Sequence, residues 1–178
     1  MLKATNIELR ALEPNDIDLL YLWENDDSVW HLSNTITPFS RFQLEQYVLN
    51  TEQDIFSSKQ LRLMIDKIEN NKKTTIGSID IFDFDPINKR AGLGILIDKK
   101  ERKKGYASQA LENLLKYCFE ILHLHQVYCN ITTENEASIK LFKKFDFVIS
   151  GTKKDWLLIR NSWQDEWFLQ LINPNINI

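Results

Sequence analysis

Residues 90–122 have the sequence RAGLGILIDKKERKKGYASQALENLLKYCFEIL, which indicates the fold more clearly than any other stretch of the chain. The aliphatic run at 91–97 has the short length and β-branched content of a strand that is covered on both faces. From Ala107 onward, apolar residues recur at helical spacing, at positions 107, 110, 111, 114, 115, 118, 119 and 122. A loop rich in lysine and arginine separates the two patterns. The stretch therefore predicts a strand, a basic loop and a helix.

The start of this helix has the properties of an anion site. The first backbone N–H groups of a helix lack intrahelical partners, and the helix dipole places partial positive charge there, which favours phosphate. Gly105 has no Cβ, so a ligand can approach the backbone closely. Arg102, Lys103 and Lys104 supply the positive charge that a pyrophosphate needs. The alternative is that these cations form a solvated surface turn.

The spacing of the loop favours the first interpretation. The pattern Arg102-x-x-Gly105-x-Ala107, between a strand and a helix, resembles the Gln/Arg-x-x-Gly-x-Gly/Ala motif of the GNAT superfamily of acyl-CoA-dependent N-acetyltransferases. Two other phosphate motifs do not fit. The chain has no Gly-x-x-x-x-Gly-Lys-Ser/Thr sequence, and Gly92-x-Gly94 lies inside the expected strand without a third glycine.

A second motif follows the first in the expected order. Residues Asn135 to Ser138, followed by Asp146-Phe147, resemble the Asn-x-x-Ser/Ala…Gly-Phe sequence found after the CoA loop in the same superfamily, with Asp146 in place of the usual glycine. The best match is the branch that contains ribosomal-protein alanine acetyltransferases and spermidine acetyltransferases. The resemblance covers nearly the whole chain.

The resemblance implies an α+β fold, with a mixed, mostly antiparallel sheet of about seven strands flanked by about four helices. It also implies that the fourth and fifth strands splay apart in a V. Hydrophobic patterns predict strands near 7–12, 61–66, 74–84, 91–97, 126–132, 148–158 and 163–172, and helices near 17–24, 38–48, 107–122 and 135–145. Ser40 and Gln43 match a capping box. No repeat or linker divides the chain, so we expect one domain over residues 1–178.

Composition narrows the class of protein. A chain of 178 residues with 43% hydrophobic content suits one globular domain, and a net charge of -3 argues against a protein that coats nucleic acid. Cys118 and Cys129 fall in an expected helix and strand, so we expect buried thiols, and no Cys/His cluster has zinc-site spacing. The sequence shows neither a signal-peptide core nor a run of membrane-spanning length, so we expect a cytoplasmic protein without membrane or metal partners.

The resemblance implies acetyl-CoA as the cosubstrate, with its pantetheine arm lying between strands four and five like an added strand. The expected cofactor contacts come from strand four, from the basic loop with the first helical turn, and from the helix near 135–145. They are Ile95, Ile97, Arg102, Lys103, Lys104, Gly105, Tyr106, Ala107, Ser108, Asn135, Ser138 and Phe142.

The proton transfers leave several alternatives open. Acetyl transfer needs a neutral amine, a polarised thioester and a proton for the leaving thiolate. Many relatives carry a glutamate base on strand four, but the matching position here is Gly92. The carboxylates that could substitute for it are Asp80, Asp83, Asp26 and Asp27, although each also suits a solvated turn.

The acid is equally open, because the position of the usual tyrosine is Phe142, which cannot donate a proton. Ser138 matches a serine of the ribosomal-protein branch and is the candidate general acid, or else it satisfies a free N–H at the helix start. Asn135 suits a helix cap, a hydrogen bond to the pantetheine, or both.

The acceptor is expected to be a small-molecule or peptide amine. Glu24, Asp26 and Asp27 form an acidic group that suits a cationic amine, or simply a solvated turn. Among the tryptophans, which are otherwise typical of a core, Trp30 and Trp156 are the preferred pair for an acceptor wall. Asp80 completes the expected substrate contacts.

Two functions remain. The first is an N-acetyltransferase that acts on a polyamine, a peptide N-terminus or an amino sugar by direct attack in a ternary complex. The alternative is an acyl-CoA-binding regulatory module that kept the fold and lost turnover, which Gly92 and Phe142 favour. Dimers are frequent among proteins of the resembling superfamily, so a homodimer is one possible assembly, but no residue pattern here specifies an interface.

Overall fold

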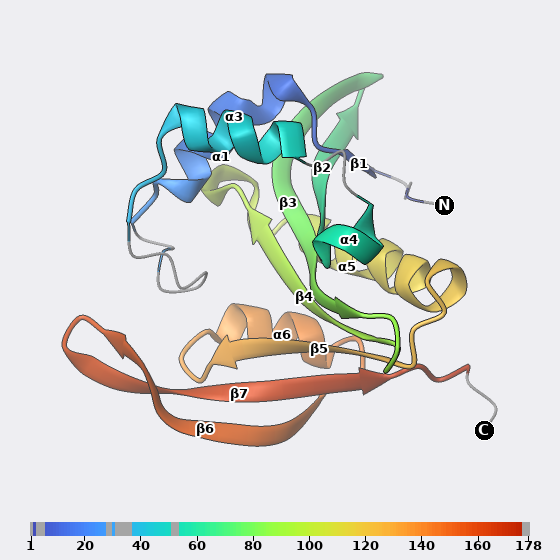
Figure 1. The fold of residues 1–178 in the computed structure, drawn as a ribbon, viewed down its shortest axis with the longest axis vertical. Coiled ribbons are helices and arrows are strands. Elements are labelled where there is room, and N and C mark those ends of the chain that lie inside the picture. The colour runs from blue at the N-terminus through green and yellow to red at the C-terminus, as the bar shows by residue number, and fades with distance from the viewer. Residues whose placement is uncertain (1, 3–5, 28–29, 31–36, 51–53, 176–178) are drawn as a thin grey trace.

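The structure is a computed structural model that describes residues 2, 6–27, 30, 37–50 and 54–175. Seven strands form one sheet in the order β1-β2-β3-β4-β5-β7-β6 (Figure 1). The strands are β1 (Ile7–Ala11), β2 (Leu61–Glu69), β3 (Lys72–Asp85), β4 (Arg90–Ile97), β5 (Gln126–Thr132), β6 (Val148–Ile159) and β7 (Ser162–Ile172). The helices are α1 (Ile17–Glu24), α3 (Arg41–Asn50), α4 (Ile55–Ser58), α5 (Tyr106–Lys116) and α6 (Glu136–Lys143). The expected mixed sheet of seven strands is confirmed.

Strands β4 and β5 are parallel and pair over only three residues. Arg90, Ala91 and Gly92 pair with Gln126, Val127 and Tyr128. Beyond this point β4 continues its ladder with β3, and β5 continues its ladder with β7. The edges that face each other are therefore unpaired among the described strands, and Figure 1 shows the two strands diverging. The expected V-shaped splay is confirmed.

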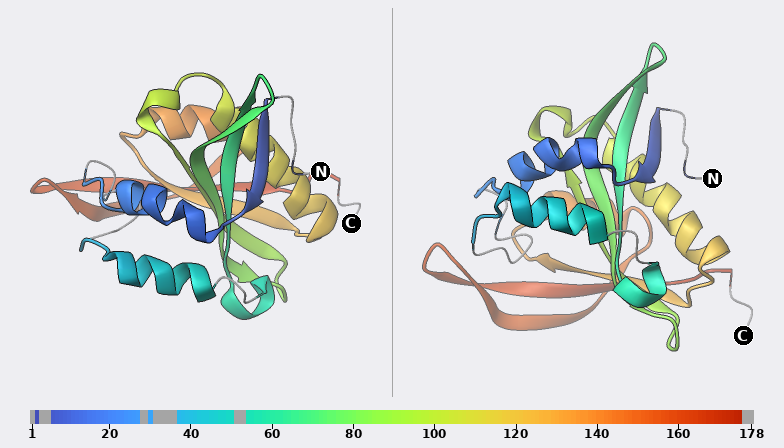
Figure 2. Two further views of the ribbon diagram at one scale, coloured as in Figure 1. Left: turned by 90° about the horizontal axis from the view of Figure 1, so that it is seen from above. Right: turned by 45° about the horizontal axis from the view of Figure 1, so that its top comes forward.

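Two apolar cores hold helices against opposite faces of the sheet (Figure 2). The larger core joins α5 and α6 to one face and includes Ile65, Ile79, Leu93, Leu114 and Ile139. The smaller core joins α1 and α3 to the other face and includes Leu20, Trp23, Leu44, Val48 and Met64. Side chains on neighbouring positions of the central strands thus point into different cores, which follows from the two-residue period of a strand.

The helices agree with the sequence predictions at two places and differ at a third. Ser40 and Gln43 form the capping box, since Ser40 N–H donates to Gln43 Oε1 at 2.7 Å and Gln43 N–H donates to Ser40 Oγ at 3.1 Å. The expected helix 107–122 is α5 followed by a π turn at Tyr117–Ile121. The helix α4 is missing from the sequence prediction, because four residues are too few to show a helical period.

The cysteines are as expected, since Cys118 and Cys129 are both buried and free. Burial raises the pKa of the Cys118 thiol to about 12, so it remains protonated at neutral pH. In the described part of the chain, no helix is long and apolar enough to cross a membrane. The same residues contain no group of three or more side chains placed to hold a metal ion.

Replacing Gly77 by alanine is expected to lower the free energy of unfolding by about 2 kcal/mol, because overpacking forces neighbouring atoms to shift. A Cβ on Gly77 would lie 2.1 Å from the carbonyl oxygen of Leu96, which is backbone of the paired strand β4. Urea denaturation followed by circular dichroism measures the change. The matched control is Gly151→Ala, since a Cβ on this exposed glycine meets no described atom within 4 Å. Equal losses of unfolding free energy in the two variants would contradict the explanation that the close approach of β4 requires a glycine at position 77.

Candidate functional site

The loop that leaves β4 presents an open helix N-terminus. Strand β4 ends at Ile97, a 3-10 turn covers Lys99–Glu101, and Gly105 precedes α5 with a φ of +85°. A Cβ on Gly105 would meet no atom of the described residues within 4 Å, so these residues leave the space in front of the helix open. Lys103 is exposed and also has a positive φ, of 62°. The loop therefore leaves room for an anion at the first turn of α5.

The cations of this loop are not equivalent. Lys104 donates to Glu101 Oε2 at 2.8 Å, and Lys67 donates to Glu101 Oε1 at 2.8 Å. The lysines, Lys104 first, hold the pKa of the Glu101 carboxyl below its ordinary value. Arg102 Nε donates to the carbonyl oxygen of Ile97 at 2.9 Å and so braces the loop. Part of the charge that the sequence assigns to a pyrophosphate is thus used within the protein.

The first turn of α5 offers backbone more than side chains. The Tyr106 side chain is buried, with its hydroxyl donating to Glu69 Oε1 at 3.3 Å. The Ser108 hydroxyl accepts a hydrogen bond from Lys144 Nζ at 2.7 Å. Ala107 packs against the larger core. For Tyr106 and Ala107, a role in cofactor binding rests on their N–H groups.

Strand β4 provides the unpaired edge expected for the pantetheine. Ile95 and Ile97 pair with β3 and lie beyond Gly92, where pairing with β5 has stopped. The carbonyl oxygen of Ile97 already accepts from Arg102, so the edge that remains open runs through Leu93 to Leu96. An extended ligand can add to such an edge as a strand does.

The three residues that the second motif contributes to the expected site, Asn135, Ser138 and Phe142, have different surroundings in the structure. Asn135 Oδ1 accepts from the N–H of Ser138 at 3.2 Å, so Asn135 caps the helix. Within the described residues, the hydroxyl of Ser138 has no hydrogen-bond partner. Phe142 is only 3% exposed, and its ring packs edge-on against Phe147 with centroids 5.0 Å apart. Ser138 is available for chemistry, whereas Phe142 is mainly a core residue.

An ion-pair network lies on the opposite face, between α1, β2 and β3. Arg62 Nε donates to Asp80 Oδ1 at 2.7 Å, and Arg62 Nη1 donates to Glu24 Oε1 at 2.6 Å. The guanidinium also lies over the ring of Tyr47, 5.5 Å from its centroid. Side chains of all three ionic residues are at most 20% exposed. Two carboxylates share one cation here, which leaves one negative charge.

The end of α1 is fastened to the loop after β4. Asp26 pairs with Lys99 at 2.7 Å, and Trp23 Nε1 donates to Asp98 Oδ2 at 3.4 Å. Asp27, the next residue, is exposed. The structure therefore separates the two aspartates that the sequence groups together: Asp26 holds the loop, and Asp27 faces solvent.

The two tryptophans chosen for an acceptor wall come from different elements. Trp30 donates from Nε1 to the carbonyl oxygen of Glu24 at 2.7 Å and so lies beside the end of α1. Trp156 is 55% exposed on β6, where Lys153 Nζ lies 5.1 Å from the centroid of its ring. Lys153 is itself held by Glu166 at 2.8 Å.

Sequence reasoning did not assign Arg62 or Tyr128 to the site. Arg62 pairs directly with Asp80 across β2 and β3, and Tyr128 donates from its hydroxyl to Asp83 Oδ2 at 3.2 Å. An alternating strand pattern shows which face a residue shares with its neighbours, but only the strand register shows which residue lies opposite.

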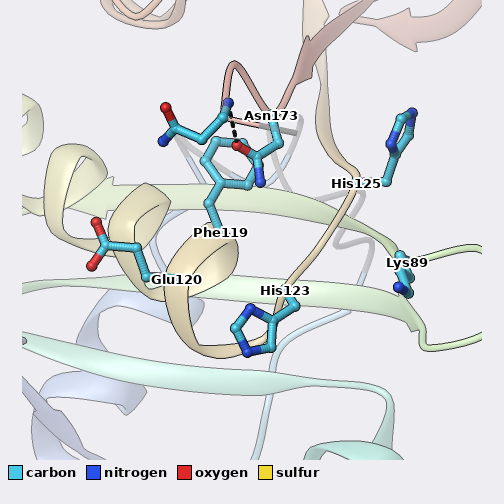
Figure 3. A pocket seen from close by; sticks show the side chains of 7 residues that line it. Lys89, Phe119, Glu120, His123, His125 and Asn173 are labelled. Carbon is cyan, nitrogen blue, oxygen red and sulfur yellow. Dashed lines mark hydrogen bonds between the residues drawn. The ribbon is translucent and has the colours of Figure 1, made fainter. Parts of the chain in front are cut away.

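A hollow of about 430 Å³ lies elsewhere, at the end of β4 remote from the basic loop (Figure 3). Its lining residues are Lys89, Phe119, Glu120, His123, His125, Asn173 and Asn175. None of these is among the expected site residues. The hollow is therefore distinct from the candidate site.

Comparison with known proteins gives one family match and several relatives. Residues 6–148 match the model of the family described as "Acetyltransferase (GNAT) domain". A spermidine N(1)-acetyltransferase of Vibrio cholerae serotype O1 is 25% identical over 164 residues, which cover 90% of each chain. An uncharacterized N-acetyltransferase, p20, of Bacillus licheniformis is 27% identical over 172 residues, covering 96% of this chain and 95% of the relative.

A solved structure shares the fold. The spermidine N-acetyltransferase from Vibrio cholerae in complex with CoA and spermine has a TM-score of 0.86 and 23% identity, covering 95% of this chain and 96% of that one. The splay between β4 and β5 thus belongs to a fold that occurs in a solved acetyltransferase.

Gly105→Asn is expected to weaken CoA binding at least about tenfold, or about 1.4 kcal/mol, by filling the space at the helix N-terminus. Asparagine tolerates a positive φ better than most residues, so the variant should fold. Titration calorimetry measures the affinity, and a melting curve measures stability. Gly151→Asn is the control at another open position. Unchanged affinity in the Gly105 variant would remove this loop from the site.

Proposed function

Because this chain belongs to the acetyltransferase (GNAT) family and is therefore an N-acetyltransferase, we propose that the amine it acetylates is a polyamine of the spermidine class. The observation that carries the proposal is the surplus of negative charge at Glu24, Asp80 and Arg62, two carboxylates on one guanidinium. A relative named for spermidine acetylation, aligned over 90% of this chain, supports the same class.

Acetyl-CoA is the cosubstrate, and the two arms of the splay suit its two halves. The pyrophosphate would lie against the N–H groups of the first turn of α5, with Arg102 and Lys103 beside it. The pantetheine would extend along the unpaired edge of β4 and carry the thioester toward the point where β4 and β5 meet. Both placements use backbone groups, the first N–H groups of α5 and an edge of β4 that pairs with no other described strand.

The acceptor would approach from the face covered by α1 and α3. A polyamine is a chain of ammonium groups separated by methylenes, and it requires negative charge at intervals along a partly apolar surface. Asp27 is exposed near one end of this face, and Asp83 is exposed near the other. Exposed ion pairs contribute little singly, so charge distributed along the chain matters more than any one contact.

Ser138 is the group proposed to protonate the thiolate. Its hydroxyl is free among the described residues, and it stands at the start of α6, the helix that the second motif begins. A positioned proton donor typically accelerates such a step by orders of magnitude. The amine nitrogen forms a bond to the thioester carbon, the carbon–sulfur bond breaks, the serine proton passes to the sulfur, and a proton from the nitrogen restores the serine hydroxyl.

Ser138→Ala should lower kcat by roughly a hundredfold with little change in KM, if the hydroxyl acts only in the transition state. Asn135 Oδ1 accepts from the backbone N–H of Ser138, so the alanine variant keeps the helix cap and removes only the hydroxyl. Thiol release at saturating acetyl-CoA measures both constants. Ser150→Ala, at an exposed position of β6, serves as control. A kcat within twofold of the parent enzyme would leave Ser138 without a role in the chemistry.

Thiol release from acetyl-CoA should be fastest with spermidine in a panel that includes an alanine-initiated peptide and an amino sugar. Raising salt from about 0.1 M to about 1 M shortens the screening length from about 10 Å to about 3 Å, so KM for spermidine should rise more than KM for a monoamine. The monoamine controls for salt effects on CoA.

Two results of the same amine panel would contradict the proposal. Turnover confined to peptides or amino sugars would assign a different acceptor. CoA binding without release of thiol for any amine would contradict an active transferase and would favour a binding module.

A further inference from the structure

The position of the usual strand-four glutamate is closed by a ring from the neighbouring strand. Gly92 pairs with Phe82 across β3 and β4, and a Cβ built on Gly92 would lie 2.2 Å from Phe82 Cε2. Real Cβ atoms do not approach other atoms so closely. The glycine is therefore part of a packing arrangement, and a carboxylate cannot be added there unless the ring moves.

Gly92 also allows side chains from β3 and β5 to meet across β4. Tyr128 pairs with Gly92 from the β5 side, and its ring packs edge-on against Phe82 with centroids 5.9 Å apart. Phe168 of β7 lies on the far side of Tyr128, at 5.2 Å. These three rings mark the last residue pair before β4 and β5 separate, on the face from which we propose that the acceptor approaches.

Asp83 lies beside this aromatic group. The hydroxyl of Tyr128 donates to Asp83 Oδ2 at 3.2 Å. Asp83 lies in the bulge where the register of β3 and β4 shifts between Phe82 and Asp85, and its φ is +49°. Aspartate adopts a positive φ uncommonly, and such conformations concentrate at functional sites. The bulge thus directs this carboxylate away from the regular ladder.

The neighbouring charges distinguish Asp83 from the other carboxylates of β3. Asp80 on the same strand is bound by Arg62, while Asp85 is paired with Arg90 at 3.3 Å. In the described part of the chain, Asp83 has no lysine or arginine within ion-pair distance. Among the described carboxylates named here, Asp83 therefore remains available to a cation from solution.

The hydroxyl of Tyr128 is expected to act as a hydrogen-bond donor at all physiological pH values. Burial, followed by the Asp83 charge, raises the pKa of Tyr128 to about 12, and Arg90 acts in the opposite direction. At neutral pH the hydroxyl is protonated and donates to the carboxylate. This hydrogen bond fixes the direction in which the other carboxylate oxygen points.

We propose that Asp83 takes the proton from the incoming ammonium group and that Tyr128 positions Asp83, in place of the missing glutamate. One ammonium proton passes to the Asp83 carboxylate, leaving a neutral amine. The nitrogen forms a bond to the thioester carbon, the carbon–sulfur bond breaks, and Ser138 protonates the leaving sulfur. The second proton leaves the nitrogen for the serine oxygen, and Asp83 releases its proton to water. The inference rests on the proposed function for two points, the identity of the amine and the role of Ser138 as the acid.

Asp83→Asn is the direct test, because asparagine accepts the positive φ and keeps the hydrogen bond from Tyr128. At pH 7 the variant should lose about a hundredfold in kcat/KM, and Tyr128→Phe should lose about tenfold. The deficit of Asp83→Asn should shrink as pH rises toward the pKa of the amine, since water then supplies neutral amine. CoA affinity and melting temperature should not change. Asp18→Asn, exposed on α1, is the control.

Two results would overturn the inference. One is a rate for Asp83→Asn within twofold of the parent enzyme; the other is a deficit of equal size at every pH, which indicates a structural role. If the parent enzyme acetylates an amine other than a polyamine, the proposed acceptor fails, and the same comparison with that amine still decides the role of Asp83.

A gain of function provides a second test. Adding Gly92→Glu and Phe82→Ala to Asp83→Asn opens the glycine position and places a carboxylate there. The triple variant should be at least tenfold faster than Phe82→Ala/Asp83→Asn. No gain, in a triple variant whose melting curve shows that it is folded, would contradict the proposed equivalence of the two positions.

Discussion

The separation of β4 from β5 after three paired residues is the constraint on which the rest of the site depends. Opposing attachments keep the strands apart. Leu96 packs with the α1 and α3 core, and Asp98 and Lys99 beyond β4 are bound to Trp23 and Asp26 of the α1 end. On the other side, β5 stays paired with β7 to its last residue, and α6 packs into the larger core. The open edges are thus stabilised by contacts outside the gap.

Charge pairing in this protein is selective and decides which groups remain free for ligands. In the loop, Glu101 engages Lys104 and Lys67, whereas Lys103 remains exposed. On the face covered by α1 and α3, Arg62 holds Asp80 and Glu24, whereas the partner of Asp83 among the described residues is the neutral hydroxyl of Tyr128. Within the described residues, an exposed lysine near the proposed phosphate position and an unpaired carboxylate near the proposed amine position suit the signs of the two substrates. A net charge of -3 for the whole chain conceals this division.

Local sequence patterns predicted most helices and strands. They did not predict the contacts that depend on which residues lie opposite each other in the folded sheet. The predicted strand 126–132 has the same bounds as β5, and the predicted capping box of Ser40 and Gln43 is present, because both depend on residues close in sequence. The π turn at Tyr117–Ile121 and the helix α4 could not be seen in an apolar period. Arg62 and Tyr128 were missed because their partners Asp80 and Asp83 lie 18 and 45 residues away and are identified by register alone. The sequence shows that Gly92 lacks the glutamate of relatives, but only the structure shows that the Phe82 ring occupies the space of a side chain there.

Hydrogen–deuterium exchange with and without CoA is the measurement that tests the central claim most directly, namely that the gap between β4 and β5 is the cofactor site. The account predicts that CoA slows exchange of amides in 93–96 and in 103–108, and leaves the lining of the hollow near His123 unchanged. Protection confined to that hollow, or to the β1–β2 edge, would contradict it.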